Sequence, residues 1–216
     1  MTFLNSAITV AGIDIGGDRK GCHLVVLRGR EVLCTINSND ADFLAECCCD
    51  FGVVAVAVDS PCRWSSSDVG RAAEKELAKE RIFCFATPSR ERAATNTSGF
   101  YGWMFNGEQV YRALATTYPL LNDARYSSGR VSVETFPHAI TCAMLGRDVA
   151  SAKRKRRQRR QLLEDSGIDT GALKSIDAID AALCAFTAGC LLFGKTRAYG
   201  NAEGGYIFVP TLSGVF

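Results

Sequence analysis

The sequence predicts a mixed α/β domain, because three short strands follow one another at the start of the chain and later strands are separated by helices. Gly-containing turns join the first strands, which is typical of an antiparallel meander. Residues 53–58 are apolar without interruption and suit a central strand covered on both faces. Together these patterns indicate a mixed sheet flanked by helices.

The elements of the first half can be placed from their apolar patterns and their caps. Strands are expected at residues 8–16, 22–27, 31–36 and 53–58, and helices at residues 40–50 and from about 67 to 80. Asn39 or Asp40 can cap the first helix, and Ser67 or Asp68 the second, because their side chains accept hydrogen bonds from free amides of the first turn.

The second half is less regular between residues 82 and 108. Residues 82–86 could form a short strand, and residues 96–107 have the Gly and Asn content of a loop. A fifth strand is expected at residues 130–134, and helices at 109–118, at 138–145, in the basic run up to 164, and from about 176 to 192. Pro137 can open its helix because the first turn needs no amide donor there.

Length and composition are those of a single globular domain spanning residues 1–216. Hydrophobic residues make up 47% and charged residues 22%, and 216 residues suffice for one sizeable core. The sequence shows no apolar run of the roughly 18 residues that a membrane span requires, and no pattern of a secretory signal. The ten cysteines show no metal-ligand spacing, so reduced thiols are expected. We therefore expect a cytoplasmic protein with no membrane partner.

Acidic residues stand where the apolar strands end. Asp14, Asp59 and Glu134 each close a strand, and Asp177 and Asp180 lie one turn apart on the last helix. Buried carboxylates repel one another, so gathering them at one sheet edge is favourable mainly around a hard cation. We therefore predict all five as catalytic candidates, with Asp14, Asp59 and Asp180 as ligands of Mg²⁺ or Mn²⁺.

Simpler explanations exist for each acid. Asp14 and Asp59 precede turn-forming residues and could cap turns. Asp177 could complement the dipole of its helix, whereas Asp180 lies further in.

Arginines offer a second set of partners. Glu134 could pair with Arg63 or Arg90 instead of a metal. Arg63, Arg71, Arg90 and Arg92 could also hold phosphate through their bidentate forks.

A basic run at residues 153–160 carries seven positive charges in eight residues, although the whole chain has a net charge of only +2. Such a run is often a solvated helix face. It could also bind the phosphates of a nucleic acid, since Lys and Arg gain affinity by releasing counterions. The candidate contacts are Lys153, Arg154, Arg156, Arg157 and Arg160.

Aromatic residues concentrate just before the expected helix at 109–118. They are Phe100, Tyr101, Trp103 and Phe105. They could stack on nucleic-acid bases, although aromatic residues of a long loop more often fill a core beneath it.

Four short motifs in a fixed order resemble a known family. They are Gly12-Ile13-Asp14, Val58-Asp59-Ser60-Pro61, Glu134-Thr135-Phe136-Pro137 and Asp177-Ala178-Ile179-Asp180-Ala181. From about residue 8 to residue 210, the chain resembles domain-of-unknown-function family 429, described as predicted nucleases of ribonuclease H-like fold. The last motif is also similar to that of Holliday-junction resolvases of the RuvC type.

The resemblance implies a ribonuclease H-like sheet of five strands, with a three-strand antiparallel meander and helix-linked strands. It implies that Asp14 is the metal ligand of the first strand, Asp59 a second acid, and Asp177 or Asp180 the ligand from the late helix. Glu134 has no clear counterpart in related nucleases. Resolvases of similar fold act as dimers, so the resemblance is compatible with a homodimer.

These observations favour a Mg²⁺-dependent nuclease that hydrolyses phosphodiester bonds of nucleic acid. Two other classes stay open. The run Gly12-Ile13-Asp14-Ile15-Gly16-Gly17 resembles the first phosphate loop of actin-like ATPases and sugar kinases, but a clear second Gly-rich loop is missing from the sequence. A non-catalytic nucleic-acid-binding module would keep the fold and the basic run, but unpaired carboxylates would then cost stability.

Overall fold

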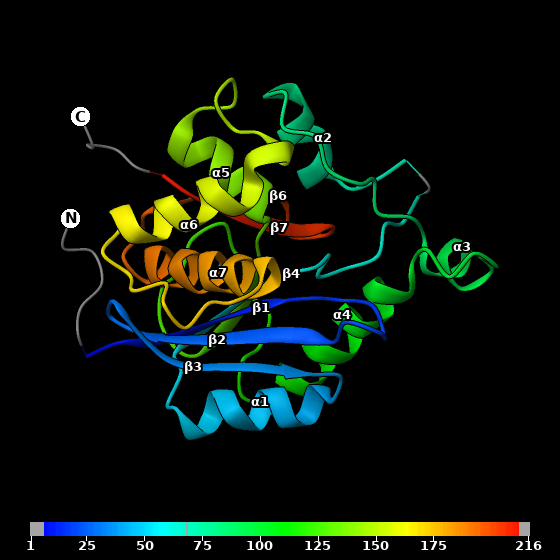
Figure 1. Ribbon diagram of the computed structural model, residues 1–216. Helices are drawn as coiled ribbons and strands as arrows, with labels where there is room; N and C mark the ends of the chain where they lie inside the picture. Colours follow the sequence, from blue (N-terminus) through cyan, green and yellow to red (C-terminus); the bar gives the residue numbers. More distant parts are fainter. Residues whose placement is uncertain (1–6, 68, 212–216) are drawn as a thin grey trace.

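Within residues 7–67 and 69–211, which the computed structural model describes, seven strands form one sheet in the order β3-β2-β1-β4-β5-β7-β6 (Figure 1). The strands are β1 (Thr9–Asp14), β2 (Cys22–Arg28), β3 (Glu31–Ser38), β4 (Ala55–Asp59), β5 (Val131–Glu134), β6 (Thr196–Asn201) and β7 (Gly205–Pro210). β1, β2 and β3 pair antiparallel, whereas β4 runs parallel to β1 and β5 parallel to β4. The predicted ribonuclease H-like mixed sheet with its meander is therefore confirmed.

Seven helices and one 3-10 turn accompany the sheet in the described part of the chain. They are α1 (Ala41–Asp50), α2 (Ala72–Lys79), α3 (Arg90–Ala94), α4 (Gly102–Leu114), α5 (Pro137–Leu145), the 3-10 turn η1 (Ala152–Arg154), α6 (Lys155–Asp165) and α7 (Ile176–Leu192). The predicted cap of α1 is confirmed, because the side chain of Asp40 accepts from the amide of Phe43 at 3.0 Å. Among the described residues, every helix is too short or too polar to cross a lipid bilayer.

The structure differs from the sequence prediction in several places, among them the start of α4 at Gly102, within the predicted loop at 96–107. The sheet has seven strands rather than five, because the β6–β7 hairpin adds to the edge beside β5. Residues 82–86 form no strand. Helix α2 begins at Ala72 with Arg71 at its N-cap, not at Ser67, and Asp68 lies outside the described residues.

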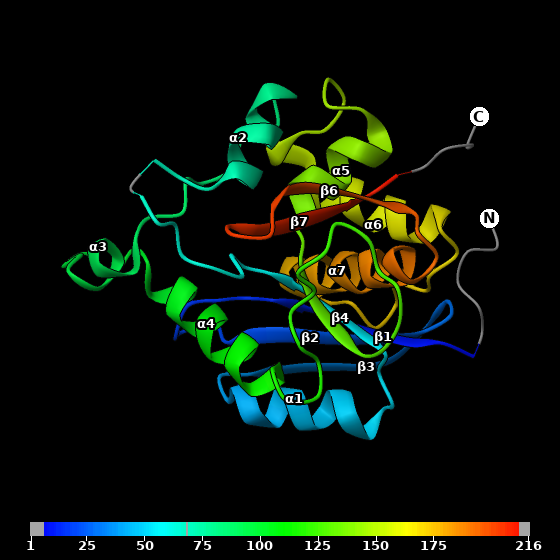
Figure 2. The same ribbon diagram turned by 180° about the vertical axis from the view of Figure 1, so that it is seen from behind.

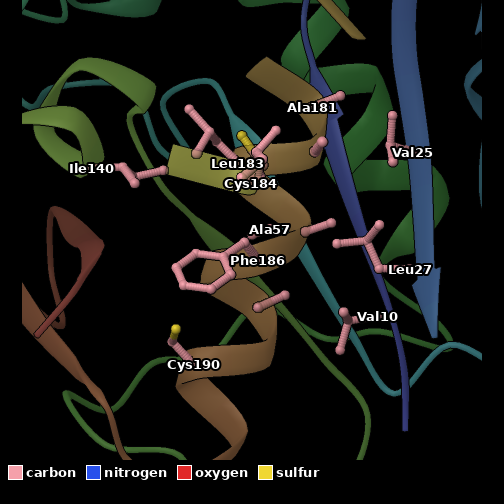
Figure 3. Close-up of a cluster of buried hydrophobic side chains, with 14 of the residues drawn as sticks. Val10, Val25, Leu27, Ala57, Ile140, Ala181, Leu183, Cys184, Phe186 and Cys190 are labelled. Carbon is pink, nitrogen blue, oxygen red and sulfur yellow. The ribbon is translucent and has the colours of Figure 1, made fainter. Parts of the chain in front are cut away.

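Two hydrophobic clusters cover the two faces of the sheet. Successive side chains of a strand point to opposite faces, so Val10 of β1 packs with α7, whereas Ala11 and Ile13 pack with α1 and α4. Figure 1 shows α7 lying along the sheet beside α6, and Figure 2 shows α4 crossing the other face near α1. In Figure 3, side chains of α7 meet those of β1, β2 and β4, and Ile140 of α5 completes the cluster.

Close contact between β1 and α7 depends on Gly12. A Cβ atom at this position would lie 2.0 Å from the carbonyl oxygen of Ala181 and 2.2 Å from the amide nitrogen of Ala185. Only glycine allows the helix backbone to approach the strand so closely. The approach places the first turns of α7 beside the end of β1, where the acidic residues lie.

Candidate functional site

Asp14 and Asp59 are the last residues of β1 and β4 and are direct partners in the parallel register of these strands. Both point to the α7 face, because Val10 in β1 and Ala57 in β4, an even number of residues earlier, pack in the α7 cluster. Their carboxyl groups form a hydrogen bond with each other. The sequence prediction that these two acids meet at one edge of the sheet is therefore matched by the geometry.

The environment favours the protonated form of this pair. Burial raises the pKa of Asp14 well above its usual value, and the charges of Asp59 and Asp180 raise it further. Burial also raises the pKa of Asp59, to about 7, with a further contribution from Asp180. The two carboxyl groups are coupled, so the raised pKa values belong to the pair as a whole.

Asp180 forms a buried ion pair with an arginine from the basic run. Nη1 of Arg159 donates to Oδ2 of Asp180, and the two residues are only 7% and 6% exposed. Burial raises the pKa of Asp180, while the charge of Arg159 acts in the opposite direction. Oδ1 of Asp180 and Nε of Arg159 are buried without a hydrogen-bond partner. An unsatisfied buried polar atom is costly, so the ion pair leaves part of its hydrogen-bonding capacity unused at this place.

Asp177 lies one turn earlier on α7 and is more open to solvent. Its carboxylate is 3.6 Å from Nζ of Lys20 and 3.9 Å from Nε2 of His23. His23 is the register partner of Asp14 on β2, so this group borders the Asp14–Asp59 pair. Asp177 therefore belongs to the same acidic edge, although the ammonium group of Lys20 already stands beside it.

A cavity of about 540 Å³ opens over these acids. We call it the acidic cavity. Its floor is formed by Asp14, Asp59, Asp177 and Asp180, its flank by Lys20, Lys155 and Arg159, and its rim by Phe100, Trp103 and Phe136. It thus combines carboxylates, cations and aromatic rings within one opening.

Glu134 is the one predicted catalytic acid that does not line the acidic cavity. Its two carboxylate oxygens accept from Nη1 and Nη2 of Arg71 at 2.8 and 2.7 Å, and one of them also accepts from the amide of Cys62. The other side of Arg71 binds Glu74 at 2.8 Å. The predicted partners Arg63 and Arg90 are wrong, because Arg71 takes this place.

The register explains why Glu134 points elsewhere. Glu134 pairs with Val58 rather than with Asp59. Val133 packs in the α7 cluster, so the next side chain must point to the opposite face. This alternation is present in the sequence Val-Ser-Val-Glu and could have separated Glu134 from the other acids.

The other candidate arginines are also engaged with protein groups. Arg63 donates to Oδ1 of Asn122 at 2.6 Å, and Arg90 pairs with Glu108 at 3.0 Å. Of the four arginines proposed as phosphate partners, Arg92 is exposed on α3. None of the four lines the acidic cavity.

The basic run is divided between several roles. Lys153, Arg154, Arg156 and Arg157 are exposed, as a nucleic-acid contact requires. Arg160 is half-buried, and its Nη1 donates to the carbonyl and hydroxyl oxygens of Thr170 at 2.9 and 2.7 Å, so it fixes the loop before α7.

The two residues of the run that reach the acidic cavity are Lys155 and Arg159. Neither is among the predicted phosphate contacts. Their spacing of four residues, which puts them on one face of α6, is the signal that could have identified them.

The oxygen-rich site suits a hard cation in chemical type. Among the described residues, no group of three or more His, Cys, Asp or Glu side chains is arranged to hold a metal ion. Mg²⁺, however, is often held by one or two carboxylates together with water and substrate phosphate. Asp14 and Asp59 form such a pair, and Asp180 lines the same cavity. The residues therefore fit a magnesium or manganese ion.

Comparisons with known proteins give two similar solved structures and one family. The structure of Thermus thermophilus RuvC matches with a TM-score of 0.46 and 16% identity, covering 88% of this chain and 99% of that chain. T. thermophilus RuvC in complex with a Holliday junction substrate matches with a TM-score of 0.44 and 17% identity, covering 88% and 98%. None of the curated proteins compared with the chain matches it. The model of the family described as protein of unknown function DUF429 matches residues 12–204, so this protein belongs to the DUF429 family.

Proposed function

We propose that this protein is a divalent-metal-dependent hydrolase that cleaves phosphodiester bonds of nucleic acid. The observation that carries the proposal is the Asp14–Asp59 pair, two strand-end carboxyl groups in direct register that line the acidic cavity. Such a pair is costly unless a proton or a metal compensates its charge. A cation bound here would activate a water molecule and stabilise the leaving oxygen of the phosphodiester.

The residues around the pair have separate tasks in this proposal. Asp14 and Asp59 would hold the cation in place of a proton, and Asp180, which lines the same cavity, would add a third carboxylate. Lys155 and Arg159 line the cavity where a phosphate would be placed, and their charges can bind its oxygens. Asp177 can orient water at the open edge of the cavity.

Glu134 acts at a distance in this proposal. Through Arg71 it connects β5 with Glu74 of α2 and with the carbonyl of Gly204 in the β6–β7 turn. Glu134 also accepts a hydrogen bond from the backbone amide of Cys62, which follows Asp59 by three residues. We therefore assign Glu134 a structural role, holding the segment after β4 in place.

Thermal unfolding across Mn²⁺ or Mg²⁺ concentrations tests the metal site. Binding to the native state adds RT ln(1 + [L]/Kd), roughly 2.7 kcal/mol at a hundredfold excess over Kd. We expect a concentration-dependent rise of Tm in the wild type, no rise in Asp14→Asn, and the wild-type rise in the control Asp50→Asn, which alters an exposed residue of α1. The rise should be larger at pH 8 than at pH 6, because the ion must displace the proton.

The same three proteins are then assayed for cleavage of labelled DNA and RNA. Cleavage by the wild type and Asp50→Asn, but not by Asp14→Asn, is the expected result. An equal Tm rise and equal cleavage in Asp14→Asn would refute the proposed site.

A further inference from the structure

Two exposed phenylalanine rings meet at the rim of the acidic cavity. Phe100, which lines the cavity, is 48% exposed, and Phe85 is 63% exposed. The two rings lie edge to face with centroids 5.4 Å apart, and Tyr101 contacts Phe100 in the same way at 5.0 Å. Grouped aromatic rings that remain open to water indicate a surface with an apolar, flat partner.

The rings are positioned by the beginning of α4. This helix starts at Gly102, seven residues before the predicted start, and Trp103 in its first turn lies between the cavity rim and the core cluster beneath α4. The space around the Cβ positions of Gly99 and Gly102 is open. Neither glycine therefore carries a side chain that would narrow the approach to Phe100, which keeps 48% of its surface exposed.

Cations continue from the cavity onto the surface. Lys20 and Lys155 line the cavity, and the side chain of Lys20 is 68% exposed. The exposed residues Lys153, Arg154 and Arg156 extend the positive charge along η1 and α6. A ligand that fits both features has flat apolar groups and a line of negative charges.

We propose that the acidic cavity takes an unpaired nucleotide of single-stranded nucleic acid, with its base stacked on Phe100 and its backbone following the cations. This inference rests on the proposed function, which places a phosphodiester at Asp14 and Asp59. In a duplex the base faces are covered by neighbouring bases, so Phe100 could not stack on them. Single strands expose these faces, and aromatic side chains bind them without sequence preference.

Fluorescence anisotropy with labelled oligonucleotides tests the proposal, using the full chain in EDTA at pH 6.5 so that no cleavage occurs. The probes are a single strand of DNA, a single strand of RNA, a duplex of equal length, and an abasic strand that keeps the phosphates but lacks bases. We expect the single strands to bind more tightly than the duplex and the abasic strand. The tighter of the DNA and RNA strands identifies the sugar preferred.

Phe100→Ala should weaken binding of the single strand at least fivefold, since loss of one base stack costs roughly 1–3 kcal/mol. The matched control is Phe43→Ala on α1, because Phe43 is 44% exposed and lies on the far side of the sheet. It should leave binding unchanged. Phe100→Ala that binds like the wild type, or a duplex or abasic strand that binds as tightly as the single strand, would overturn the proposal.

The outcome is separable from that of the proposed function. Binding that depends on Phe100 without any cleavage in Mn²⁺ would refute the hydrolase and support the stacking site. Cleavage of a duplex that does not depend on Phe100 would refute the stacking site and support the hydrolase. Binding of an apolar peptide that depends on Phe100, with no binding of any oligonucleotide, would also refute the stacking site.

Discussion

Arg159 on α6 neutralises Asp180 on α7, yet each of these buried groups keeps one polar atom without a partner. The pair lies beside the Asp14–Asp59 pair and lines the same cavity. Its charges are balanced, but its hydrogen-bonding capacity is not filled. Arg159 therefore restrains Asp180 at the edge of the acidic cavity.

Replacing Arg159 by Met should destabilise the protein strongly in the absence of metal. Breaking a buried pair leaves an uncompensated charge, which costs roughly 3–5 kcal/mol. Arg157→Met, in the exposed part of the same helix, should change the unfolding free energy by less than about 0.5 kcal/mol. Urea unfolding measures both. Because Asp180 then lacks its counter-charge, the Tm rise with Mn²⁺ should also be larger in Arg159→Met. Equal unfolding free energies in the two variants would contradict this prediction.

The stability of the metal-free protein should fall as pH rises from about 4 to 7 and beyond. The pKa values of Asp14 and Asp59 are raised above the unfolded value of 3.8. The folded state therefore binds more protons than the unfolded state in this window, so the unfolding free energy decreases with pH. Asp14→Asn should flatten the slope and be more stable than the wild type at pH 8. Urea unfolding at several pH values checks this prediction. If the unfolding free energy of Asp14→Asn fell with pH as steeply as that of Asp50→Asn, the prediction would be wrong.

Glu134→Gln should destabilise the protein without removing the response to metal. Arg71 would lose its bidentate partner in a buried position, at a cost of roughly 3–5 kcal/mol. Glu46→Gln, on the exposed face of α1, is the control and should have little effect. Melting with and without Mn²⁺ separates the two roles. If stability were unchanged and the Mn²⁺ effect lost, Glu134 would be a metal ligand after all.

Gly12→Ala should reduce stability by at least about 1–3 kcal/mol, since the added methyl group would overlap the backbone of α7. Gly17→Ala is a suitable control, because no atom lies within 4 Å of its Cβ position. Denaturant unfolding compares the two. A Gly12→Ala variant as stable as Gly17→Ala would show that α7 can move away from β1 at no cost.

The sequence predicts β1, β2 and β4 well, because each contains a short continuous apolar stretch. It predicts α4 poorly, because Gly102 and Gly107 read as helix breakers. The structure shows why Gly107 is tolerated: a Cβ atom there would lie 2.0 Å from Oγ of Ser60, so glycine permits close packing of the helix against the segment after β4. Tertiary packing outweighs local propensity at this position.

The acidic site is predictable only in part. The sequence shows which residues are acidic, but not in which direction each side chain points. Asp14 and Asp59 follow from strand ends, and Asp180 from its place on the last helix. The separation of Glu134 requires the strand register, which a single sequence gives only through the alternation of Val131 and Val133. The partner of Asp180 requires the crossing of α6 over α7, which no local pattern contains.

The close contact of α7 with Gly12 also constrains how the protein can be synthesised. β1, β2 and β4 are made early, whereas the helix that covers their common face is made late. A ribosome-bound chain must therefore keep this apolar face uncovered until α7 emerges, and during that interval it is exposed to aggregation or to chaperones. Asp180 arrives with the same helix, so an unfinished chain cannot complete the acidic cavity.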